Sequence, residues 1–129
     1  SAQPTLLVLG EAEFAAAVKR ALRDVTRPDR LRDNPLLRSR IVTERAGKDA
    51  STGERAAALQ QIVTEAATLG QTAADRRLAR VLYRAYLSPA PTLERAAEVL
   101  DLPSSTFRRL LTTAVARVVG ILWHRELDG

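Results

Sequence analysis

The most informative part of this chain is the stretch T-L-E-R-A-A-E-V-L-D-L-P-S-S-T-F-R-R-L-L, at residues 92–111. Two short helices that cross at a steep angle need small and apolar side chains at set places, and this stretch provides them. Ala96 and Ala97 give the first helix a small inner face. Phe107 and Leu110 face inward from the second helix at a spacing of three residues. The stretch therefore predicts two crossing helices joined by a tight turn.

This stretch resembles the helix-turn-helix of sigma-factor region 4 and of LuxR-type response regulators, which often carry A-x-x-L-x-L-x-x-S-T, then a hydrophobic residue and R-R-x-L. Asp101 stands where these families usually have Gly, and Asp is one of the few residues that tolerate the left-handed backbone of such a turn. Pro103 stands where a capping Ser is common, which leaves the cap to Ser104 or Ser105. The resemblance implies a double-stranded DNA-binding module of a bacterial transcription regulator.

By this resemblance, the second helix would enter the major groove with the side away from Phe107 and Leu110 exposed. An Arg side chain can contact guanine with two hydrogen bonds, and Ser or Thr can reach a phosphate or a base edge. Arg108 and Arg109 are the residues expected to read bases. The full set expected to contact DNA on this helix is Ser104, Ser105, Thr106, Arg108, Arg109 and Thr112. Helix pairs of this kind also occur in protein-binding scaffolds, where paired Arg residues are simply solvated.

A second basic group precedes the motif. Arg76, Arg80 and Arg84 follow one another at a spacing of four, with Arg77 beside them, opposite an apolar helix face. In related domains the preceding helix often crosses the DNA backbone, so these side chains are expected to meet phosphates. The alternative is an ordinary solvated face in an arginine-rich protein.

Length and composition favour one helical domain, or slightly more than one, with a genuine core. The chain has 129 residues, 46% of them hydrophobic, but only five are aromatic and none is Cys. No stretch resembles a signal peptide or is apolar for long enough to span a membrane, so a cytoplasmic protein is expected. The net charge of +5 fits a polyanionic partner, although fifteen acidic residues dilute the twenty basic ones.

The common signatures of enzymes are missing from the sequence. The six Gly residues are scattered and form no phosphate-binding loop. His124 is the only histidine, so it cannot belong to a multi-histidine metal site, and any histidine-based catalysis would depend on it alone. The prediction is a non-enzyme without metal, cofactor or small-molecule substrate.

The remaining sequence predicts an all-α chain of about six helices. The expected ranges are 11–24, 35–45, 51–70, 72–87, 92–100 and 104–127, with an N-terminal bundle in residues 1–71 and the helix-turn-helix unit in residues 72–129. Capping boxes at Ser51 with Glu54 and at Thr72 with Asp75 open two of these helices. Thr5–Leu9 is expected to form a short strand or an extended apolar arm.

The last helix carries apolar residues over a wider arc than one neighbour needs. Either the N-terminal helices or a second copy of the chain must cover it. The alternative function is therefore a protein-interaction module that dimerises, or that docks on RNA polymerase or on another domain of its parent. A start of S-A-Q-P and the absence of Met suggest a piece of a longer protein.

Overall fold

The computed structural model describes residues 8–128, and this part of the chain is all-α, as predicted. In addition to seven α-helices it has one 3-10 helix and one π-helical turn. The elements are α1 (Glu11–Asp24), α2 (Pro28–Leu31), η1 (Pro35–Arg38), α3 (Arg40–Ala46), α4 (Thr52–Ala66), α5 (Ala73–Leu82), η2 (Tyr83–Leu87), α6 (Leu93–Val99) and α7 (Ser104–Asp128). Most of the arm predicted at Thr5–Leu9 lies outside the described residues. Leu9 itself is irregular and packs against the core.

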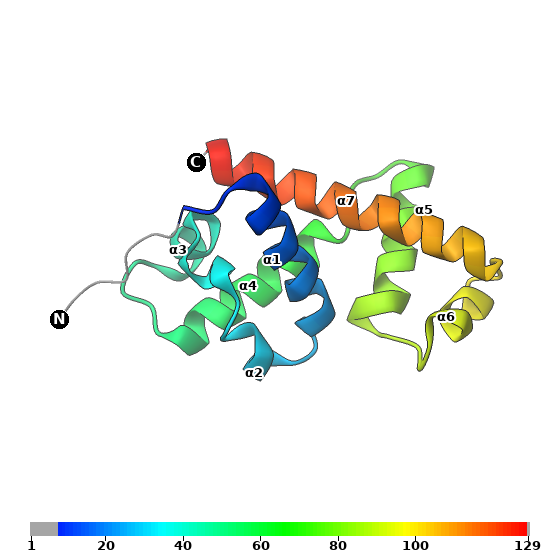
Figure 1. Cartoon of the computed structure of the whole chain (residues 1–129), viewed down its shortest axis with the longest axis horizontal. Helices are drawn as coiled ribbons and strands as arrows, with labels where there is room; N and C mark the ends of the chain where they lie inside the picture. Colours follow the sequence, from blue (N-terminus) through cyan, green and yellow to red (C-terminus); the bar gives the residue numbers. More distant parts are fainter. Residues whose placement is uncertain (1–7, 129) are drawn as a thin grey trace.

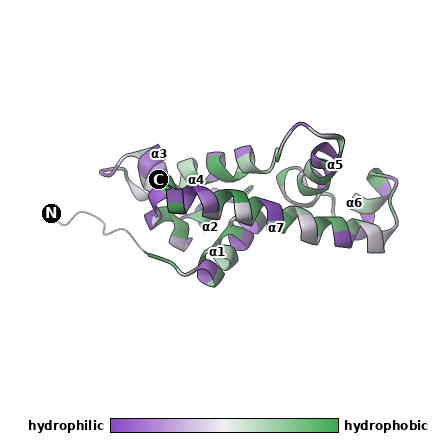
Figure 2. Cartoon of the chain, turned by 90° about the horizontal axis from the view of Figure 1, so that it is seen from above, coloured by the Kyte–Doolittle hydropathy of each residue, from purple (hydrophilic) through white to green (hydrophobic). Residues whose placement is uncertain are grey.

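Helix α7 is the long element that ties the fold together, and it extends from one end of the molecule to the other (Figure 1). Its first half packs on α5 and α6, and its second half packs on α1, α3 and α4 (Figure 2). The buried residues of α7 are Phe107, Leu110, Ala114, Val118 and Leu122. The N-terminal helices thus cover much of the apolar arc, which was one of the two alternatives expected.

The division expected at residue 71 falls between α4 and α5, but one continuous core joins the helices on both sides. The ring of Phe14 on α1 lies 5.1 Å from that of Trp123 on α7, measured between centroids. The two-part organisation stays a prediction, and α7 packs against helices on both sides of the expected division.

Capping side chains begin two of the helices where the sequence predicts them. The Ser51 side chain accepts a hydrogen bond from the Glu54 amide at 3.1 Å, while the Glu54 carboxylate accepts one from the Ser51 amide at 2.9 Å. Thr72 and Asp75 form the same reciprocal pair at the start of α5. Both capping boxes are confirmed.

The single helix predicted for residues 35–45 is wrong. Asn34 caps only the 3-10 helix η1, by accepting a hydrogen bond from the Leu36 amide at 2.9 Å. Ser39 then adopts an extended conformation and caps α3 through the Val42 amide, so the chain turns between the two elements. The preceding loop also contains the short helix α2, which was not expected.

The arginine stripe expected on one continuous helix is also interrupted. The α-helical register ends at Leu82, and η2 follows with a wider hydrogen-bonding pattern, in which the Ser88 amide donates to the Tyr83 carbonyl at 2.8 Å. Arg84 lies in η2, where it is half-buried and its Nε atom is enclosed with no hydrogen-bond partner in the described part of the chain, residues 8–128. Arg84 therefore does not continue the exposed face of Arg76 and Arg80.

Two polar side chains hold the N-terminal helices in place. Arg55 is buried, with no carboxylate partner among residues 8–128, and its guanidinium donates to the carbonyl oxygens of Leu37, Lys48 and Ala50 and to the Thr43 hydroxyl. Glu126, near the end of α7, accepts hydrogen bonds from the amides of Arg40 and Ile41 at 3.0 Å each. Glu126 thus accepts hydrogen bonds from backbone amides in the first turn of α3, which have no carbonyl partner within that helix.

Candidate nucleic-acid interface

The turn between α6 and α7 has the tight, defined geometry that its sequence predicts. Asp101 has φ 57°, in the left-handed region. Its amide donates to the Glu98 carbonyl and the Leu102 amide donates to the Ala97 carbonyl, both at 2.9 Å. These two bonds are those of a Schellman motif, which closes the end of a helix. The expectation of a left-handed Asp101 is confirmed.

Helix α7 begins directly after this turn. The Phe107 amide donates to the Pro103 carbonyl at 2.9 Å, so Pro103 stands at the cap position and Ser104 is the first helical residue. Ser104 and Ser105 therefore lie in the first turn of α7 rather than at its cap, and both are exposed.

An open face follows the first three turns of α7. Ser105, Arg109 and Thr112 recur at spacings of four and three, which places them on one side of the helix. All three are exposed, while Phe107 and Leu110 on the other side are 0% and 9% exposed. Thr106, expected to be exposed with them, is half-buried. Five of the six residues expected to contact DNA on α7 are thus exposed, and Thr106 is displaced from the face.

Arg108 lies at the edge of this face and forms an ion pair with a residue of α6. Its Nη2 atom lies 2.5 Å from Oε1 of Glu94, and both side chains are more than half exposed. The pKa of the Glu94 carboxyl is lowered, first by its own backbone amide and then by Arg108. At neutral pH this pair is charged, and the Arg108 guanidinium already has an anionic partner within the chain.

Arg109 differs from its neighbour. Its side chain has no hydrogen-bond or ion-pair partner among residues 8–128, and it is exposed. Thr112 and Thr113 each turn a hydroxyl back to a carbonyl one turn earlier, at 3.1 and 3.2 Å. Arg109 is therefore a cation on the open face without a partner among residues 8–128, and its neighbours on this face have short hydroxyl side chains.

The arginines of α5 flank this motif. Arg76 and Arg80 are exposed, as expected. Arg77, which the sequence placed only beside the stripe, lines a hollow together with Arg80 and with Leu100 and Leu102 from the turn. The sequence placed Arg77 beside the stripe but did not indicate its contact with the turn, because that contact depends on how α5 crosses α7.

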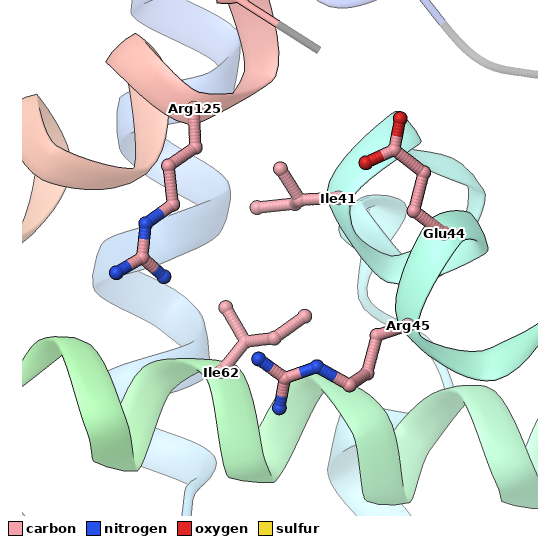
Figure 3. Close-up of a pocket in the computed structure, with 5 residues that line it drawn as sticks. All are labelled: Ile41, Glu44, Arg45, Ile62 and Arg125. Atoms are coloured by element: carbon pink, nitrogen blue, oxygen red, sulfur yellow. The ribbon is translucent and has the colours of Figure 1, made fainter.

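A second hollow lies at the other end of the molecule, between α3, α4 and α7 (Figure 3). Its volume is about 270 Å³, with Ile41 and Ile62 directed into it and Arg125 at its edge. Arg45 also lines it but is held by both carboxylate oxygens of Glu65, at 2.9 and 3.0 Å. The cations and carboxylates here largely balance, so nothing singles this hollow out as an anion site.

Residues 8–128 contain no group of three or more His, Cys, Asp or Glu side chains placed to hold a metal ion. His124 is exposed and lies 2.7 Å from Asp128. No helix in this part of the chain combines the length and the apolar character needed to cross a membrane.

Comparison with protein-family models, with curated proteins and with solved structures gave no match for this chain. The resemblance to helix-turn-helix regulators consequently depends on residues 92–111 alone.

Proposed function

We propose that this chain binds double-stranded DNA, with the first three turns of α7 in the major groove. The observation that carries the proposal is the open face of Ser105, Arg109 and Thr112, which starts directly after a hydrogen-bonded turn and contains no carboxylate. The motif of residues 92–111 supports a role in transcription through its resemblance to sigma region 4 and LuxR-type domains.

The dimensions agree with this proposal. An α-helix with its side chains is about 10 to 12 Å wide, and the major groove of B-DNA is about 12 Å wide. The face of α7 that enters the groove would carry only short hydroxyl side chains around Arg109, so the helix can approach the base edges closely. The buried side, anchored by Phe107 and Leu110, keeps this face in a fixed orientation.

The structure favours unequal roles for the two adjacent arginines. Arg109 can direct a free guanidinium fork at a guanine, which is the commonest specific contact in this groove. Arg108 would first have to leave Glu94, or would contact DNA while paired with it. We therefore expect Arg109 to determine sequence preference and Arg108 to contribute less.

The test begins by selecting a preferred duplex from a random pool with the wild-type chain. Fluorescence anisotropy then compares the affinity for that duplex with the affinity for a scrambled one. Arg109→Ala should reduce this discrimination by about 1 to 3 kcal/mol. Arg108→Ala should reduce it less. Arg30→Ala removes one exposed cation from α2 and should leave the discrimination unchanged.

Salt separates this function from its alternative, a protein-docking module. Binding through phosphates weakens steeply with salt because counterions are released, whereas docking of apolar helices does not. If the folded wild-type chain binds no duplex even at low salt, the proposal is wrong and docking on RNA polymerase or on another domain takes its place.

A further inference from the structure

The first two turns of α5 form a cationic surface that the chain does not neutralise. Arg76, Arg77 and Arg80 are exposed, and none has an ion-pair partner among residues 8–128. Asp75 is the only acidic residue of α5, and it already pairs with Arg117 of α7 at 2.9 Å. Like charges three or four residues apart on a helix repel one another. This repulsion would be relieved by an external anion.

Two of these arginines share a hollow with the turn of the motif. Arg77 and Arg80, with Ala73, form one wall of a space of about 260 Å³, and Leu100 and Leu102 form the other wall. The two leucines flank Asp101 and are fixed by the hydrogen bonds of the turn. The apolar wall excludes water on one side, and a charge interaction is stronger where water is partly excluded.

The start of α5 is also held in place, so the backbone that carries the two arginines has a defined position beside the turn. The capping box of Thr72 and Asp75 sets the start of the helix, and the ion pair of Asp75 with Arg117 joins this start to α7. Arg77 and Arg80 then lie one turn apart on the same side of α5. The hollow is thus bounded by two rigid elements and two adaptable cationic side chains.

We propose that this hollow binds a phosphate group of the DNA backbone between the guanidiniums of Arg77 and Arg80. This inference rests on the proposed function, because it assigns the anion to the duplex whose groove receives α7. Planar guanidinium forks suit phosphate oxygens, which accept two parallel hydrogen bonds. The hollow adjoins the turn that leads into α7, so one strand of the duplex would pass over it. Arg77 thereby replaces Arg84 as the partner of Arg80.

The test is a salt titration of duplex affinity with three variants. The double variant Arg77→Ala/Arg80→Ala should weaken binding to two unrelated duplexes by the same factor. It should also lower the slope of log affinity against log salt by about 0.9, the value for one lost phosphate contact. Arg77→Lys/Arg80→Lys should keep most of the slope, because it retains both charges.

The matched control is Arg30→Ala/Lys48→Ala, which removes one exposed cation from α2 and one from the loop between α3 and α4. The control should keep the wild-type slope, and circular dichroism should show that every variant is folded. A wild-type chain that binds with the usual salt dependence, and a double variant that binds equally well, would overturn the phosphate site and leave the proposed function standing. An equal loss of slope in the control would also overturn it, since the attraction would then be diffuse. A wild-type chain that binds no duplex would remove both proposals.

Discussion

Arginine side chains lie in opposite surroundings in two parts of this chain. The guanidinium of Arg55 is enclosed by the chain, whereas those of Arg77, Arg80 and Arg109 are exposed. Arg55 in α4 is 5% exposed, and every hydrogen bond found for its guanidinium ends on an oxygen atom of the chain itself. The three arginines of α5 and α7 are exposed and find no such partner among residues 8–128. Arg55 therefore holds the N-terminal helices together, whereas Arg77, Arg80 and Arg109 face outward.

This difference shows why net charge alone is a poor guide to a binding surface. Several cations of the N-terminal half are engaged within the chain, for example Arg45 by Glu65 and Arg20 by Asp24. The Arg40 side chain donates to the backbone carbonyl of Glu126. Others, such as Arg30 and Lys48, are exposed without an ion-pair partner among residues 8–128, so charge alone does not separate the two halves. What distinguishes Arg77 and Arg80 is the hollow that they share with the turn of the motif.

The strongest test of this comparison replaces an arginine with methionine at one position in each half, Arg55 or Arg77. Arg55→Met removes the donors that satisfy three carbonyl oxygens and one hydroxyl, and a buried polar group left unpaired costs about 1 to 3 kcal/mol. We expect Arg55→Met to lower the free energy of unfolding by about 3 kcal/mol or more, as measured by urea denaturation. Arg77→Met should change it by no more than about 0.5 kcal/mol, because the side chain is exposed. Similar losses for the two variants would contradict the distinction between inward and outward arginines.

A smaller effect is expected where the end of α7 meets α3. Glu126→Gln exchanges one carboxylate oxygen for an amide group, which cannot accept the hydrogen bond that the Arg40 or Ile41 amide now donates. We expect a loss of about 1 kcal/mol in the free energy of unfolding, from that bond and from the charge at a helix start. Duplex affinity should not change, because this contact lies at the far end of α7 from the proposed interface (Figure 1). A change in affinity without a change in stability would show that Glu126 acts on DNA binding.

Local signals in the sequence predicted much of this arrangement. Ser51, Thr72 and Asp101 each act within a few residues, through a capping side chain or a tolerated backbone conformation, so their roles follow from neighbours in the chain. The buried positions of Phe107 and Leu110 follow from helical periodicity in the same way. Most of the proposed DNA-contacting face was identifiable because it is the opposite side of that pattern.

Features that depend on distant residues were not predicted. The burial of Arg55 requires carbonyl groups from η1 and from the loop after α3, and the role of Glu126 requires a helix start more than eighty residues earlier. The pairing of Arg108 with Glu94 depends on the crossing angle of α6 and α7, which the motif does not specify. The left-handed residue after α4 is Leu69 rather than the adjacent Gly70, a choice for which the sequence carries no signal.

The smallest expected effect concerns Asp75. This residue acts locally, in the capping box of α5, and also at a distance, through its ion pair with Arg117 of α7. The pKa of its carboxyl is lowered, mainly by the Thr72 hydroxyl and next by Arg117. A carboxyl whose pKa is lower in the folded state contributes stability above its unfolded pKa, and this contribution is lost as the pH falls through the folded pKa. We therefore expect the chain to lose stability below about pH 4, where an unfolded Asp takes up its proton.

Nuclear magnetic resonance titration of the Asp75 carboxyl should show its pKa rising in both Thr72→Ala and Arg117→Ala, and rising more in Thr72→Ala. A larger rise in Arg117→Ala would mean that the ion pair to α7, rather than the cap of α5, sets the charge of Asp75.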